Sequence, residues 1–111
     1  MRKTTVSSRR REEYEVQLAD EDVLKVRFDR ILKKVIDFSV QYLAWIEGIW
    51  RPVVRIDTAH GKAHIDTTHP DGTKTTKDLP IQDYNEALTW SLEHLKRRWK
   101  FYRQRHERWM K

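Results

Sequence analysis

The segment from Arg55 to Gly72 concentrates side chains that could do chemistry. It reads RIDTAHGKAHIDTTHPDG and holds three of the five histidines, three acids and an arginine. Histidines that titrate near neutral pH can act as general base and general acid, while an arginine stabilises a phosphorane-like transition state. These are the components of metal-free RNA cleavage. The candidate acid and base are His60 and His64, Asp57 would orient a histidine, and Arg55 would stabilise phosphate.

Two other interpretations of this segment stay open. Imidazole and carboxylate ligands also suit a divalent metal, which would use His60, His64 and His69. No recognised metal-ligand spacing such as H-E-x-x-H occurs, and we expect no cofactor. The third interpretation is an ordinary polar sheet face whose hydrogen bonds fix a turn.

Alternating side chains predict the strands that position this segment. Apolar residues at every second position from Val35 to Ile46 indicate a half-buried strand, and residues 50–57 predict its return strand. Residues 63–68 alternate again. If the last two strands join at His60-Gly61, Asp57 and His64 lie close across the pair, on the face opposite the apolar side chains.

A second candidate region is the C-terminal helix predicted from Asp83, which has Glu86 three residues later as in a capping box. Residues 96–111 hold eight basic side chains, one acid and several aromatic rings. Cations release counterions from phosphates, and rings stack on unpaired bases. A homodimer or partner-protein interface would use the same surface. The candidate nucleic-acid-binding residues are Lys96, Arg97, Lys100 and Arg103, with Tyr102 for stacking.

Length and pattern together predict one domain. The chain has 111 residues, enough for one core and too few for two. We expect an α+β fold in which one long C-terminal helix packs across an antiparallel sheet of four to five strands. Residues 1–12 would form a disordered basic arm, and residues 13–111 the folded domain.

Composition restricts the partners and the compartment. The net charge is +6, with the positive charge concentrated at both ends of the chain, a polarity that suits RNA, another nucleic acid or an acidic protein. There is no cysteine, and a secreted domain this small usually needs disulfides. Neither a signal peptide nor an apolar membrane span is recognisable. We therefore expect a cytoplasmic protein without a membrane partner.

The stretch from Asp37 to Gly72 carries a resemblance. Its "VVRIDTAHGKAHID" and "HPDG" motifs, with "NEALTWSLEHLKRRWKFYRQR" in the helix, resemble a family of short bacterial and archaeal proteins without an assigned function. The order of an Arg-x-Asp strand, a histidine cluster and a helix is also similar to TumE-type toxins of toxin–antitoxin pairs, with matching positions at Arg55, Asp57, His60 and His64. That similarity implies a growth-inhibiting, RNA-directed toxin that is neutralised by a helix-turn-helix partner. The basic surface suggests that such an antitoxin protein would be acidic.

The leading hypothesis is therefore a toxin-like, RNA-directed protein and a candidate metal-free ribonuclease. A non-enzymatic nucleic-acid-binding or protein-interaction module is the first alternative. A metal-dependent enzyme built on His60, His64 and His69 is the second.

Overall fold

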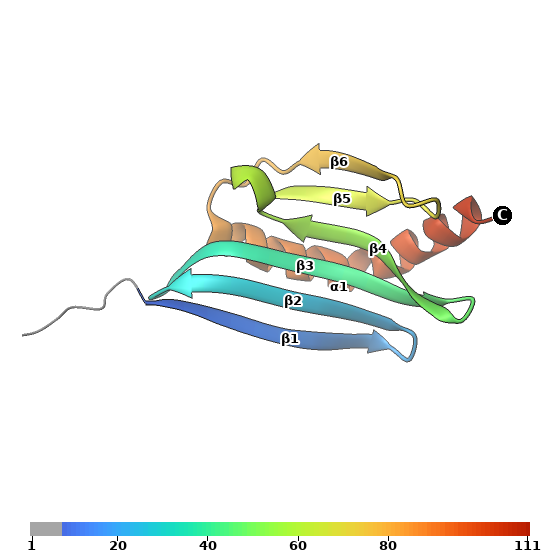
Figure 1. Ribbon diagram of the computed structural model, residues 1–111, viewed down its shortest axis with the longest axis horizontal. Coiled ribbons are helices and arrows are strands. Elements are labelled where there is room, and N and C mark those ends of the chain that lie inside the picture. Colours follow the sequence, from blue (N-terminus) through green and yellow to red (C-terminus); the bar gives the residue numbers. More distant parts are fainter. Residues whose placement is uncertain (1–7) are drawn as a thin grey trace, which may run out of the picture.

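A single antiparallel sheet and one long helix make up the protein (Figure 1). The computed structural model describes residues 8–111. The six strands follow one another across the sheet in chain order, and each pairs antiparallel with the next. The elements are β1 (Arg9–Ala19), β2 (Asp22–Ile31), β3 (Lys34–Ile46), β4 (Ile49–Asp57), the 3-10 turn η1 (Ala59–Gly61), β5 (His64–Thr68), β6 (Lys74–Asp78) and α1 (Tyr84–Trp109).

The α+β class and the long C-terminal helix are confirmed, but the sheet has six strands where the sequence predicted four to five. The outer strands account for the difference. All five residues of β6 are exposed and none is apolar, so the strand is specified by its pairing with β5 and not by an alternating pattern.

Part of the predicted basic arm belongs to the sheet. Residues 1–7 lie outside the described part of the chain, whereas residues 9–12 belong to β1. Charged residues form a strand here because their neighbours on β2 carry complementary charges. Asp29 is bound by Arg9 and Arg11, and Glu12 lies 3.4 Å from Arg30, and opposite charges across a strand pair favour the pairing.

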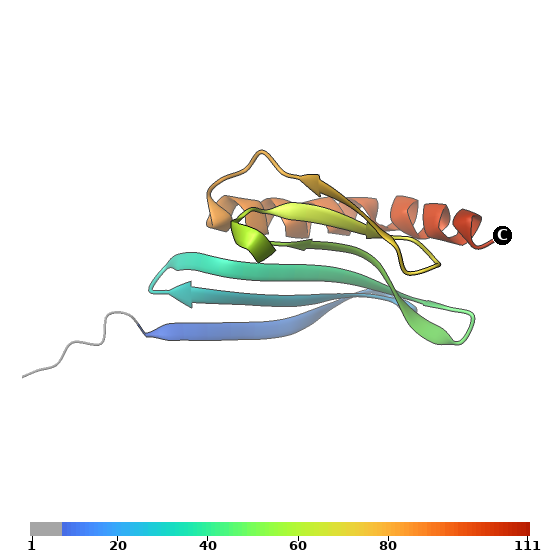
Figure 2. The same cartoon turned by 45° about the horizontal axis from the view of Figure 1, so that its top comes forward.

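The core lies between the sheet and the helix. In β3, buried side chains alternate with half-buried or exposed ones from Phe38 to Ile46, because successive side chains of a strand point to opposite faces. The buried set of β3 faces α1, as do Val54 and Ile56 of β4. Figure 2 shows the helix lying along this one face of the sheet. The other face carries mostly polar side chains and is uncovered.

The start of the helix is capped and anchored to the sheet. Asp83 caps the helix by accepting hydrogen bonds from the backbone N–H groups of Asn85 and Glu86, as the sequence predicted. The Asn85 side chain bonds to the backbone of Lys33 and Val35. These contacts hold the first turn of α1 beside the β2–β3 turn.

Tight turns set the register of the sheet. The loop between β3 and β4 contains only Glu47 and Gly48, both with positive φ, the geometry of a type I′ hairpin. The predicted His69–Gly72 turn is also present, closed by a hydrogen bond from the Gly72 N–H to the His69 carbonyl. Within the described residues, no helix is long and apolar enough to cross a membrane.

Candidate functional site

The last residues of β4 and the first residues of β5 form a group of charged side chains, here called the sheet cluster: Arg55, Asp57, His64 and Asp66. Asp57 lies directly opposite His64, and Arg55 lies opposite Asp66. All four point to the face of the sheet that α1 does not cover, since Val54 and Ile56 point to the helix. The predicted proximity of Asp57 and His64 is confirmed.

His64 is the centre of the sheet cluster. Its Nε2 lies 3.0 Å from Asp57 Oδ1 and 3.6 Å from Asp66 Oδ2. Its Nδ1 lies 3.1 Å from the carbonyl oxygen of Lys62. The imidazole is therefore held on one side by a backbone acceptor and presents its other nitrogen to two carboxylates, which is how a histidine is oriented for proton transfer or metal binding.

The two carboxylates are held by contacts of their own. The backbone N–H of Ala59 donates to Asp57 Oδ1 at 3.0 Å, and the hydroxyl of Thr76 donates to Asp66 Oδ1 at 2.7 Å. Arg55 approaches Asp57 Oδ2 at 3.7 Å and stays 40% exposed. The cluster is thus an ordered set of charges that opens to solvent through Arg55. Asp66 was not among the predicted catalytic residues, although its spacing of two from His64 places both on one face.

The β4–η1 junction explains why these residues meet. Thr58 is buried and bonds back to β3, where its backbone N–H donates to the Phe38 carbonyl and its hydroxyl accepts from the Phe38 N–H. His60 then takes a left-handed conformation, with φ of 68°, before Gly61. This reversal returns the chain so that β5 pairs with β4.

The other two histidines of the segment stay outside the cluster. His60 is exposed in η1 and makes no hydrogen bond or ion pair with residues 8–111. His69 stacks on Trp109 with ring centroids 4.3 Å apart and contacts the Thr75 hydroxyl. The predicted pairing of His60 with His64 is therefore not assembled, nor is a His60, His64 and His69 metal triad. The potential ligand atoms that do converge, within 4.8 Å of one another, belong to Asp57, His64 and Asp66.

The outer side of α1 carries a second candidate region, here called the basic ridge: Lys96, Arg97, Lys100 and Arg108. All four side chains are exposed, and none forms an ion pair with an acid within residues 8–111. The three predicted residues Lys96, Arg97 and Lys100 are therefore available to an external anion, and Arg108 extends the row by two turns.

Exposed aromatic rings border the basic ridge. Phe101 and Trp109 are 42% and 40% exposed. The guanidinium of Arg105 lies between them, 5.4 Å from the Phe101 ring centroid and 4.8 Å from that of Trp109. Arg98 covers Phe101 at 4.9 Å. Cation–π contacts of this kind keep flat rings at the surface.

The structure places the remaining predicted binding residues, Arg103 and Tyr102, in the fold and not on the ridge. Arg103 Nη1 lies 2.8 Å from buried Asp22, and its Nη2 donates to the Trp45 carbonyl. The Tyr102 ring is buried and its hydroxyl bonds to His94. Burial raises the pKa of Tyr102. Neither side chain presents itself to a nucleic acid in this structure.

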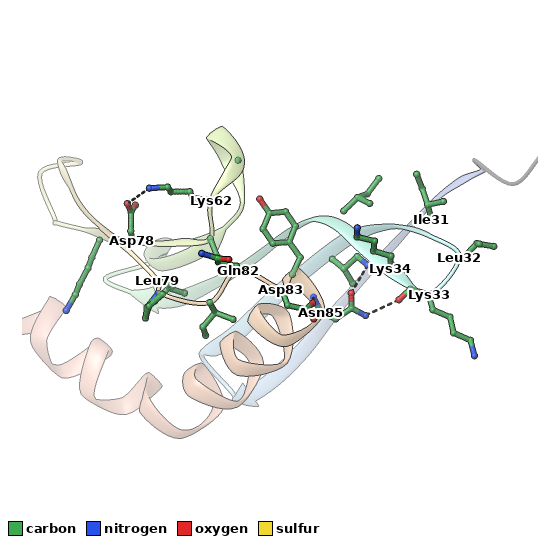
Figure 3. A pocket seen from close by; sticks show the side chains of 18 residues that line it. Ile31, Leu32, Lys33, Lys34, Lys62, Asp78, Leu79, Gln82, Asp83 and Asn85 are labelled. Atoms are coloured by element: carbon green, nitrogen blue, oxygen red, sulfur yellow. Dashed lines mark hydrogen bonds and ion pairs between the residues drawn. The ribbon is translucent and has the colours of Figure 1, made fainter.

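A groove beside the start of α1 lies apart from both regions (Figure 3). It runs between the β2–β3 turn, the β4–β5 connection and the segment that precedes the helix. An ion pair of Lys62 with Asp78 and the bond of Asn85 to Lys33 border it. None of the predicted catalytic or nucleic-acid-binding residues lines this groove.

Residues 5–111 match the family model described as "Domain of unknown function (DUF7718)", and the chain belongs to this family. No curated protein matches the chain, and no solved structure matches it.

Proposed function

We propose that this protein is a toxin-like, RNA-directed protein that binds RNA through the basic ridge. The observation that carries the proposal is a row of four exposed cations without an acidic partner in residues 8–111. Positively charged side chains gathered on one side of a helix repel one another, and a bound polyanion relieves that repulsion.

The size and composition of the ridge suit a single strand of RNA. Arg97 and Arg108 are eleven residues apart, or about 16 Å along a helix, which spans several backbone phosphates. Phe101 lies beside this row with the guanidinium groups of Arg98 and Arg105 over its ring, whereas Trp109 stacks on His69. Unpaired bases stack on exposed aromatic rings and on arginine, and each such stack contributes about 1–3 kcal/mol.

The toxin aspect of the proposal rests on the resemblance to TumE-type proteins and on the same ridge. An acidic antitoxin would cover Lys96, Arg97, Lys100 and Arg108 and so compete with RNA. Expression of the chain alone would then inhibit growth, and co-expression of the acidic partner would restore it.

The binding test is fluorescence anisotropy of a labelled single-stranded RNA over a range of salt concentrations. Neutralisation of two ridge contacts in the variant Arg97→Gln/Lys100→Gln should weaken binding and reduce the slope of log K against log salt by about 1.4, since each single-strand phosphate contact contributes about 0.7.

Two controls separate position from total charge. Lys33→Gln/Lys74→Gln removes the same charge from exposed positions away from the ridge and should bind like wild type. His64→Gln should also bind like wild type, because the sheet cluster lies on the opposite face of the sheet. Equal loss of binding in the Lys33/Lys74 and Arg97/Lys100 variants would refute a specific role of the ridge.

RNA cleavage at the sheet cluster is a second candidate function. The supporting observation is that Arg55, Asp57 and His64, three of the four predicted catalytic residues, converge. His64 would act as the base, oriented by Asp57, and Arg55 would stabilise the developing phosphorane charge. Cleavage of labelled RNA should disappear in His64→Gln and persist in His60→Gln, because His60 lies outside the cluster. Persistence of cleavage in His64→Gln would exclude this site.

A further inference from the structure

We propose that Asp57, His64 and Asp66 bind one divalent transition-metal ion on the uncovered face of the sheet. This site differs from the histidine triad that the sequence suggested, and it does not depend on RNA binding by α1. The occupant has a defined chemistry: a first-row ion such as Mn²⁺ or Zn²⁺, since one imidazole and two carboxylates suit these ions better than purely oxygen-binding cations.

The distances between the ligand atoms fit one ion. A first-row ion binds nitrogen and oxygen at about 2.0–2.2 Å, so ligand atoms on the same ion lie roughly 3–3.5 Å apart. His64 Nε2 lies 3.0 Å from Asp57 Oδ1 and 3.6 Å from Asp66 Oδ2, and all three atoms lie within 4.8 Å of one another. An ion enters with small side-chain adjustments.

The contacts around the three ligands are those of an oriented metal site. With an ion bound at Nε2, the His64 Nδ1–H would donate to the Lys62 carbonyl, which lies 3.1 Å away. Thr76 occupies one oxygen of Asp66 and leaves Oδ2 free. The Ala59 N–H fixes Asp57 while the same carboxylate keeps lone pairs for an ion. Each ligand is therefore held by a group that would not itself bind the metal.

Charge and access favour a bound cation. Asp57 and Asp66 bring two negative charges to one imidazole, and the nearest arginine, Arg55, is 3.7 Å from Asp57 and 40% exposed. The Asp57 and His64 side chains are each 9% exposed and that of Asp66 is 14% exposed. Three protein ligands at such a surface leave coordination positions for water, as in catalytic metal sites.

Isothermal titration of the full chain with Mn²⁺ alone, and separately with Zn²⁺ alone, tests the proposal. Wild type should bind one ion per chain. Asp66→Asn should lower the affinity at least about 10-fold, and Thr76→Val, which removes only the orienting hydroxyl, should lower it about 10-fold. The control variant His69→Gln, outside the cluster, should bind as wild type does. Circular dichroism confirms that each variant is folded.

Paramagnetic broadening by Mn²⁺ in NMR spectra locates the ion independently of affinity. Amide signals of residues 57, 64 and 66 should broaden before those of α1. The proposal is overturned if neither ion binds at one per chain, if folded Asp66→Asn and His64→Gln proteins bind as wild type does, or if broadening centres on other acids or histidines.

Discussion

The charged side chains of the sheet cluster are paired with one another, whereas those of the basic ridge have no acidic partner in residues 8–111. In the sheet cluster, Asp57 and Asp66 face His64, and Arg55 faces Asp57. In the ridge, Arg97 and its neighbours project from α1 without an acidic partner in residues 8–111. The first arrangement is complete within the chain or with one small ion, whereas the second needs a partner of opposite charge. The two regions therefore suit different kinds of ligand.

The largest expected effect separates two arginines of the same helix. Arg103→Ala should destabilise the protein by about 3 kcal/mol, because removal of one member of a buried ion pair leaves Asp22 uncompensated. Arg97→Ala, which removes an exposed and unpaired side chain, should stay within about 0.5 kcal/mol. Urea unfolding of both variants measures the difference. Equal free energies of unfolding would mean that the ion pair of Arg103 with Asp22 does not stabilise the fold.

A smaller effect is expected at Asp29, on the uncovered face, where three arginines surround a carboxylate that is 2% exposed. Hydrogen bonds from Arg11 and Arg9 hold the pKa of Asp29 well below its usual range. Asp29→Asn should cost about 1–3 kcal/mol at neutral pH. The exposed Asp78 offers the matched control, Asp78→Asn.

The pH dependence of the Asp29 effect has a definite sign. A carboxylate with a lowered folded pKa contributes stability that is present above its ordinary pKa of about 3.9 and is lost as pH falls toward the folded value. The difference between wild type and Asp29→Asn should therefore shrink from pH 5 to pH 2, as followed by chemical denaturation. A difference that stays constant would show that the arginines do not stabilise the ionised carboxylate.

The smallest effect concerns the inner side of α1. Burial lowers the pKa of His94 and of His106, so the unfolded chain takes up protons first as pH falls. Stability from this source is present above the ordinary histidine pKa of about 6.5 and decreases below it. Thermal unfolding at pH 7.5 and 5.5 should show a smaller decrease in His94→Gln/His106→Gln than in wild type. The exposed His60→Gln variant should keep the wild-type decrease.

Local pattern was sufficient to predict the central strands, the start of the helix and part of the site. The alternation around Val40 predicts β3, and Asp83 caps α1 as expected. The alternating pattern of β4 also predicts that Arg55 and Asp57 lie on the same face of the sheet. Once β4 pairs with β5, both side chains lie close to His64. These features depend on near neighbours in the chain.

The features that the sequence did not predict depend on distant contacts. The arginines at the start of β1 are paired with Asp29, eighteen residues from Arg11. The role of Arg103 is set by Asp22, 81 residues away. His60 lies outside the site because it and Gly61 both take positive φ where the chain reverses in η1. A periodic pattern within one segment does not predict contacts between residues that lie far apart in the chain.

The order of the strands has a consequence for synthesis. Each strand pairs with the one made just before it, so the sheet can assemble by successive local steps as the chain leaves the ribosome. The helix that covers Val40, Tyr42 and Ile56 is encoded after every strand. Throughout translation of the sheet, its apolar face therefore stays open and prone to aggregation. A chaperone that shields this face would have its greatest effect on yield just before residues 84–109 emerge.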